Sequence, residues 1–143
     1  MDNVQRNANA QAANGDEDVI PLYRYWNGNR PVYDHLYTTH WAELGYGAYG
    51  WVFEKIQCYV HGTQEQGTIP LHRYWNGNNP VYDHLYTTDW AELGNGAYGW
   101  KYEHIQCYVY GTQRSGTVPL YRYWNGNYPV YDHLYTTHWA ELG

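Results

Sequence analysis

One motif of aromatic and polar residues, present three times, constrains this chain more than any other feature. The motif reads Tyr-Trp-Asn-Gly-Asn and then Tyr-Asp-His-Leu-Tyr-Thr-Thr, and the segments that contain it begin at Pro21, Pro70 and Pro119, 49 residues apart. A fixed period of this length indicates a repeat architecture. The sequence therefore predicts one fold that is built from copies of a small unit.

The repeat divides the chain into two complete units, 21–69 and 70–118, and a partial third unit, 119–143. We call the first 25 residues of a unit its hairpin half and the remainder its strand half; the third unit has only a hairpin half. In the two complete units the hairpin halves agree at 22 of 25 positions and the strand halves at 16 of 24. The closer agreement of the hairpin halves favours them as the place of a binding site.

The residues before the first unit have a different character. Segment 1–19 is rich in Asn, Ala, Gln and Asp and shows no periodicity, which is typical of a flexible arm. It also lacks the basic and then apolar pattern of a signal peptide. We expect 1–19 to be a flexible arm and 20–143 to form a single β domain.

The pattern within each unit predicts strands and a single helical turn. Aromatic and polar residues alternate from Ile20 to a turn at 27–29, and alternation resumes over 32–39, which predicts a hairpin. A one-turn helix at 40–44 and a longer strand at 51–60 follow. The expected fold class is all-β with one-turn helices. Three side chains of the longer strand are expected to face the core: Ile56, Cys58 and Val60.

Composition limits the classes of partner. The apolar fraction of 43% depends heavily on 19 Tyr and 8 Trp, which are favoured at binding surfaces. A net charge of −6 argues against nucleic acid, which needs a basic face. No apolar run is long enough to cross a bilayer. Cys58 and Cys107 occupy equivalent positions and are expected to be buried free thiols.

The hairpin half offers the side chains that recognise a sugar. Aromatic rings pack on the C–H faces of a sugar, and fixed polar groups bind its hydroxyls. Aspartate accepts bonds from neighbouring hydroxyls, and charge-assisted bonds are the stronger kind. Arg24 and Asn29 are further polar groups of this half. The candidate carbohydrate-binding residues are Trp26, Asn27, Asp34, His35, Trp75, Asn76, Asp83, His84, Trp124, Asp132 and His133.

Metal binding and catalysis are less favoured. Asp34, His35 and His40 could be metal ligands, but His40 is replaced by Asp89 in the second copy, and calcium needs more oxygen atoms than one unit provides. We therefore expect no metal or other cofactor. Catalysis would need two carboxylates, and Asp34 with Glu43 or Glu54 is the available pair. Repeated weak binding sites gain avidity from their number, so we expect a binding protein and not an enzyme.

Three stretches carry a resemblance to known families: Tyr-Arg-Tyr-Trp-Asn-Gly-Asn, Tyr-Asp-His-Leu-Tyr-Thr-Thr and Trp-Ala-Glu-Leu-Gly. Over 21–143 the chain resembles the mannose-specific lectins of oyster hemolymph. It is also similar to a secreted repeat that is attached to some bacterial hydrolases. The resemblance implies a metal-free, extracellular lectin for terminal mannose that acts as a dimer in innate immunity.

Other functions stay open at this point. The aromatic hairpins could instead be core and interface of a structural or protein-interaction module, and a hydrolase fragment is a third alternative. The third hairpin half has no strand half to cover it in this sequence. Open strand edges and bare aromatic rings favour association. We therefore expect a homodimer whose interface includes 128–143.

Overall fold

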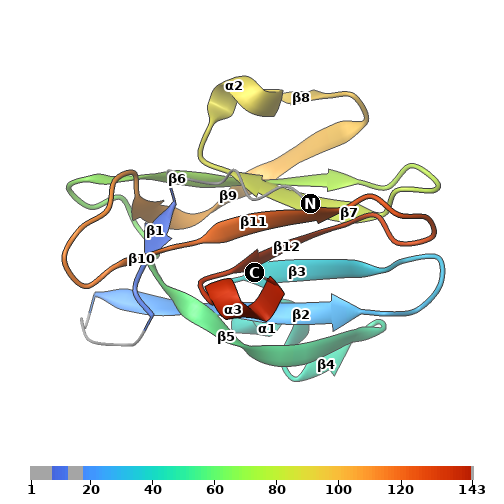
Figure 1. Ribbon diagram of the computed structural model, residues 1–143, viewed down its shortest axis with the longest axis horizontal. Helices are drawn as coiled ribbons and strands as arrows, with labels where there is room; N and C mark the ends of the chain where they lie inside the picture. Colours follow the sequence, from blue (N-terminus) through green and yellow to red (C-terminus); the bar gives the residue numbers. More distant parts are fainter. Residues whose placement is uncertain (1–7, 13–17, 143) are drawn as a thin grey trace.

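The computed structural model describes residues 8–12 and 18–142 and is built almost entirely from antiparallel strands (Figure 1). It confirms the expected all-β class with one-turn helices and a tandem repeat. The first unit contains β2 (Val19–Asn27), β3 (Asp34–Thr38), α1 (Trp41–Leu44), β4 (Gly47–Ala48) and β5 (Trp51–His61). The second contains β6 (Thr68–Asn76), β7 (Asp83–Thr87), α2 (Trp90–Leu93), β8 (Gly96–Ala97) and β9 (Trp100–Tyr110). The third contains β10 (Val118–Pro119), β11 (Tyr121–Asn125), β12 (Asp132–Thr136) and α3 (Trp139–Leu142), and β1 (Asn9–Ala10) precedes them all.

Each hairpin half forms the predicted hairpin in the same register. In the first, Trp26 lies opposite His35 and Asn27 lies opposite Asp34, and the other two hairpins repeat this pairing. The long strands β5 and β9 pair along the outer sides of β2 and β6. No helix among the described residues is long and apolar enough to cross a bilayer.

The longer strand departs from strict alternation at a β-bulge. Leu22 pairs with Cys58, but the next residue, Tyr23, pairs with Ile56, so Gln57 is skipped. A bulge reverses the faces of the residues on its two sides. Cys58 is therefore buried as expected, whereas Ile56 is 38% exposed and its predicted core position is wrong.

The two cysteines are free and buried, as the sequence predicted. Burial raises the pKa of the Cys58 thiol to about 12, so this thiol is protonated and inert as a nucleophile at neutral pH. Cys107 also has its pKa raised by burial.

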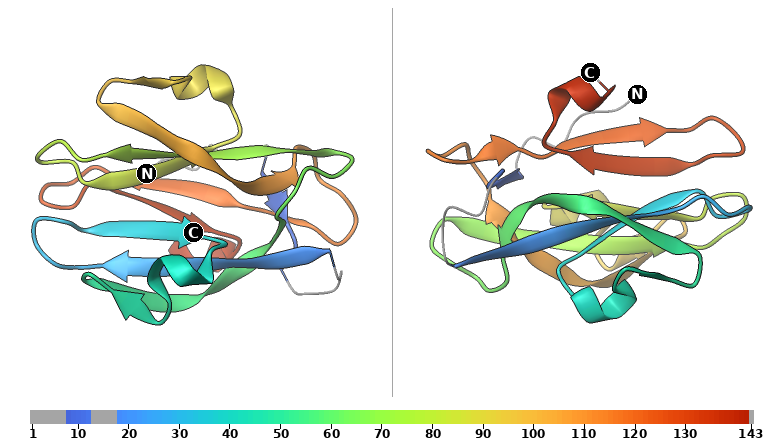
Figure 2. Two further views of the ribbon diagram at one scale, coloured as in Figure 1. Left: turned by 180° about the vertical axis from the view of Figure 1, so that it is seen from behind. Right: turned by 90° about the horizontal axis from the view of Figure 1, so that it is seen from below.

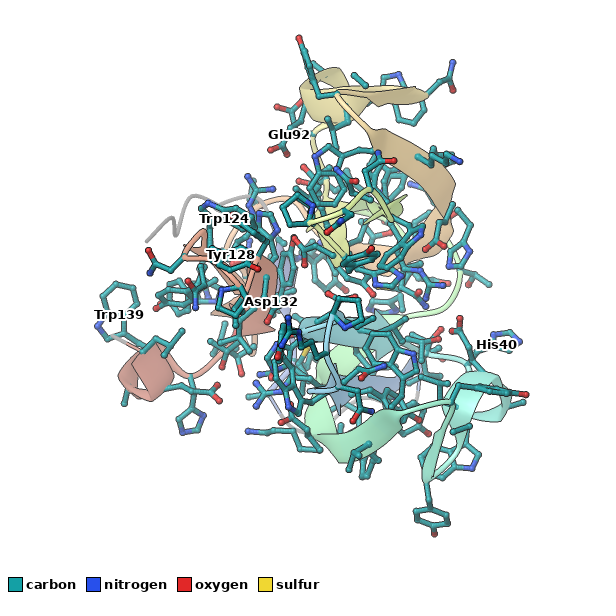
Figure 3. The ribbon with its side chains drawn as sticks, turned by 90° about the vertical axis from the view of Figure 1, so that its right-hand side faces the viewer. His40, Glu92, Trp124, Tyr128, Asp132 and Trp139 are labelled. Carbon is teal, nitrogen blue, oxygen red and sulfur yellow. The ribbon has the colours of Figure 1, made fainter. Side chains whose placement is uncertain are left out.

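The three hairpins surround a pseudo-threefold axis. Figure 3 looks along this axis, with the three helices at the periphery, and Figure 2 shows the hairpins stacked from the side. The axis is marked by a ring of tyrosines: Tyr37 donates to the Tyr135 carbonyl, Tyr135 to that of Tyr86, and Tyr86 to that of Tyr37, at 2.7, 2.9 and 2.6 Å. Each hydroxyl also accepts a backbone N–H from another member of the ring. The three units therefore share one core.

Strand β1 completes the core at the third unit. Ala10 pairs with Val118, and the Leu120 N–H donates to the Ala8 carbonyl. In this register Ala8 and Ala10 correspond to Cys58 and Val60 of the first unit, and both alanines are buried. The predicted flexible arm is therefore corrected for residues 8–10, which are part of the core. The short alanine side chains gave no hydrophobic pattern by which the sequence could reveal a strand.

Candidate functional site

The predicted aspartates and histidines meet on the axis, between the tyrosine ring and the hairpin tips. Asp34 accepts from Nδ1 of His84 at 2.6 Å, Asp83 from that of His133 at 2.5 Å, and Asp132 from that of His35 at 2.5 Å. The second carboxylate oxygen of each aspartate accepts the backbone N–H of the same histidine. Each unit is thus bonded to the next in a closed cycle.

The electrostatics of this cycle differ around the ring. Burial and the neighbouring Asp83 and Asp132 carboxylates raise the pKa of Asp34 well above its ordinary value, and burial lowers the pKa of His84. The surroundings of the Asp34–His84 pair thus disfavour charge on both groups. Burial alone would lower the pKa of His35, but the hydrogen bonds to Asp132 and Glu54 outweigh this effect and raise the pKa to about 9. The ring at His35 is protonated at neutral pH.

The three axial aspartates are also the described residues that could hold a metal ion, since their carboxylate oxygens lie within 4.8 Å of one another. Both oxygens of each carboxylate already accept bonds from a histidine. These bonds explain the position of the three carboxylates without a metal ion. The arrangement is thus first of all a connection between units.

Several predicted sugar contacts belong to this core instead. Asp34 and Asp83 have no exposed surface, and Asp132 is also buried. The Asn27 and Asn76 side chains are buried and accept backbone N–H groups within the hairpin turns. These five residues position the hairpins, and their role as sugar contacts stays a prediction.

Two of the predicted tryptophans and two of the predicted histidines lie beside pockets between units. The first interunit pocket, of about 380 Å³, lies between the first and second units. Its walls contain Trp75 and Trp51, whose rings lie 4.6 and 6.0 Å from the ring of His84. An apolar, aromatic wall is thus contributed by both units.

The same pocket contains a cluster of charged groups. Arg73 donates through Nη2 to Glu43 of α1 at 2.9 Å and through Nε to Glu103 of β9 at 2.6 Å. Nε2 of His84 lies 3.6 Å from Glu103. A guanidinium, an imidazole and two carboxylates therefore meet beside the Trp75 ring.

The second interunit pocket, of about 480 Å³, repeats this constellation between the third and first units. Trp26 lies 4.6 Å from the ring of His35. Arg24 donates through Nε to Glu54 at 2.8 Å and through Nη2 to Glu141 of α3 at 3.0 Å. Two pockets in one chain therefore share an aromatic wall and a charged cluster.

The arginines keep the pocket carboxylates ionised. Burial would raise the pKa of Glu43, but the bond from Arg73 outweighs it and lowers this pKa. The bond from Arg24 lowers the pKa of Glu141 to about 2. About a third of each of these two side chains is exposed. A charged carboxylate that is fixed in place and still partly exposed can accept further hydrogen bonds from a ligand.

Of the predicted residues, Trp26, His35, Trp75 and His84 line the two interunit pockets. Asp132 also borders the second one, although it is buried. Trp124 and His133 form the same ring pair at 4.5 Å in the third unit. Sequence reasoning missed Trp51, Glu103 and Glu141 and named Glu43 only as a possible partner of Asp34 in catalysis. The sequence did point to Glu43 and Glu54 as the carboxylates of one unit, but the partner of Glu43 is Arg73 of the next unit and is set by the packing of units.

Comparison with known protein families identifies one family that matches this chain. The model of the domain of unknown function DUF5648 matches twice, over residues 4–95 and 49–142. The two matches overlap by about one repeat unit, in agreement with the tandem repeat. No curated protein and no solved structure matches the chain. Because the two matches together cover nearly the whole chain, it belongs to the DUF5648 family.

Proposed function

We propose that this protein is a multivalent carbohydrate-binding lectin without catalytic activity, and that its sugar sites are the two interunit pockets. The observation that carries the proposal is the pairing, in both pockets, of a tryptophan wall with a fixed cluster of arginine, histidine and carboxylates. A sugar ring needs an apolar surface on one side and polar partners at its edge. Both requirements are met within one pocket.

The charged cluster suits vicinal hydroxyls. Glu43 and Glu103 are held by Arg73, so a ligand hydroxyl would meet acceptors that need no further ordering. The polar groups come from two units, and only the assembled domain brings them together. Two sites on one chain would give avidity toward a surface that carries many copies of a glycan.

We propose terminal mannose as the ligand, since the resemblance to oyster hemolymph lectins points to this sugar. An extracellular role in innate immunity follows from the same resemblance. The alternative of a structural or protein-interaction module draws support from Tyr49 and Tyr98, loop aromatics that are each 90% exposed.

Calorimetry with methyl α-mannoside and with variants of one pocket tests the sugar sites. Trp75→Ala should weaken binding at the first interunit pocket by about tenfold or more, because the ring supplies the apolar wall. Trp90→Ala is the control, since this ring also packs against a histidine, His72, at 5.0 Å but lines neither interunit pocket. Equal loss in both variants would mean that the tryptophans act through the fold alone.

A glycan array and a chromogenic glycoside distinguish the alternatives. Binding of mannose-type glycans without turnover is the expected result. If no sugar binds the protein even at millimolar concentration, the interaction module is favoured. Steady release of the chromophore, lost in Glu103→Gln, would instead identify a hydrolase.

A further inference from the structure

A third kind of cavity lies on the pseudo-threefold axis, where the three hairpin tips meet. It has a volume of about 280 Å³, and each tip contributes a proline to it. The residue before each proline also lines it: Arg30, Asn79 and Tyr128. Figure 3 looks onto this end, where Tyr128 lies on the side of the third unit that faces the other two. We call this space the axial cavity.

The axial cavity is lined by the position at which the three hairpin halves differ most. Among the 25 positions of the hairpin half, this is the only one with a different residue in all three copies. All three side chains are exposed, and the hairpins around them have the same register. The fold therefore accepts a cation, an amide or a phenol here. An identical scaffold presents three different groups to a single space.

The polar groups of Arg30 and Asn79 are available to a ligand. Arg24 and Arg73 are each engaged by two glutamates. Within residues 8–12 and 18–142, by contrast, neither the Arg30 guanidinium nor the Asn79 amide makes a hydrogen bond or an ion pair. Both are donors, and they face the same cavity.

We propose that the axial cavity binds one small carboxylate-bearing ligand per chain. The Arg30 guanidinium would pair with the carboxylate in a bidentate manner, and the Asn79 amide and the phenols of Tyr33 and Tyr128 would bind further oxygen atoms. Among the residues that the structure describes, no acidic side chain lines the cavity. The three axial aspartates are buried and each is paired with a histidine, which reduces their repulsion of an anion.

The size of the cavity limits the ligand. A volume of about 280 Å³ lies at the lower end of small-molecule sites. It suits a single sugar acid or a smaller carboxylic acid. The group that the axial cavity would recognise is a carboxylate, which can belong to a free organic acid or to an acidic sugar. This site is separate from the interunit pockets and does not depend on the function proposed for them.

Titration of the ¹⁵N-labelled protein with glucuronate, acetate and glucose tests this proposal. Glucuronate should shift the resonances of the hairpin tips, whereas glucose should not. Tighter binding of glucuronate than of acetate would identify an acidic sugar as the source, and equal binding would identify a free carboxylate. Absence of a tip-specific shift with both acids would overturn the proposal.

The chain itself provides matched variants. Arg30→Tyr makes the first tip identical to the third and should weaken glucuronate binding by about tenfold or more, because the charge-assisted bond is lost. The double variant Arg30→Tyr with Tyr128→Arg returns the cation to an equivalent position and should restore binding. Lys55→Gln removes an exposed cation elsewhere and should have no effect. Unchanged glucuronate binding in Arg30→Tyr would contradict the assignment.

Discussion

At the scale of single residues, two histidine–aspartate pairs with the same hydrogen bond differ in the pKa of their histidine. Burial raises the pKa of Asp34 and lowers that of His84, whereas His35 has a pKa raised to about 9 beside Asp132 and Glu54. A histidine with a raised pKa stabilises the fold only while it is protonated. Its contribution should be complete below about pH 6.5, decrease as the pH rises toward 9, and be absent above 9.

His35→Gln tests this pH dependence. Near pH 6 the parent should exceed the variant in free energy of unfolding by up to about 3 kcal/mol, since one pKa unit corresponds to about 1.4 kcal/mol. The difference should narrow as the pH approaches 9.5. Urea unfolding at both pH values measures it, with exposed His40→Gln as the control. A difference that stays constant with pH would contradict protonation of His35 in the fold.

The tyrosine ring is a second residue-scale feature. The Tyr86 hydroxyl donates to the Tyr37 carbonyl and accepts the Tyr37 N–H, and it is buried. Tyr86→Phe leaves these two backbone groups without that partner, which should cost about 2–4 kcal/mol. Thermal unfolding measures the loss, and Tyr98→Phe, at a highly exposed ring, should be silent. Equal stability of the two variants would show that the ring of hydroxyls is dispensable.

At the scale of elements, β1 is the strand whose contribution is least expected from its sequence. Ala10 occupies in the third unit the place that Val60 occupies in the first. Because Ala10 is buried there, the strand is a structural element of the core and not an appendage. Burial of a charge without a partner is strongly unfavourable, so this position should not tolerate a charged side chain.

Substitutions at Ala10 test this role. Ala10→Asp should lower the free energy of unfolding by about 3 kcal/mol or more. Ala10→Val should be tolerated, because the first and second units hold valine at the equivalent place. Denaturant unfolding distinguishes the two substitutions. If Ala10→Asp is as stable as the parent, β1 does not contribute to the core in solution.

At the scale of the whole molecule, the third unit differs from the other two at its outer surface. Leu142 is 51% exposed, whereas the equivalent Leu44 and Leu93 are each 9% exposed. Among the described residues, β11 pairs with β12 alone. Open strand edges and apolar side chains favour association. We propose a homodimer that covers this surface. Because Leu142 also lines the second interunit pocket, a two-fold arrangement would leave the first interunit pocket of each chain open.

Light scattering at micromolar concentration measures the assembly. The parent should have about twice the chain mass of 16.9 kDa. Leu142→Asp should shift it to the monomer, whereas Tyr98→Asp, at another exposed ring, should leave the dimer intact. A parent mass near that of one chain would exclude the dimer at this concentration.

The sequence alone determined the local structure of each unit. Alternation of aromatic and polar residues, the Asn-Gly-Asn turn and the 49-residue period are local features, so they predicted the hairpins, the long strands and the repeat. Local patterns also placed Cys58 in the core. They failed at Ile56, because a bulge is a property of two paired strands and not of one.

Only the tertiary structure decided which polar residues are core and which face a pocket. Asp34 could have faced solvent from its own hairpin, but its partner is His84, 50 residues further along the chain. Glu43 binds Arg73 of the next unit, and Glu103 reaches the same arginine from β9. The repeat shows that the units are alike, but it does not show how they are arranged around a shared axis. That arrangement is fixed by burial of the tyrosine ring, which only three assembled hairpins can provide.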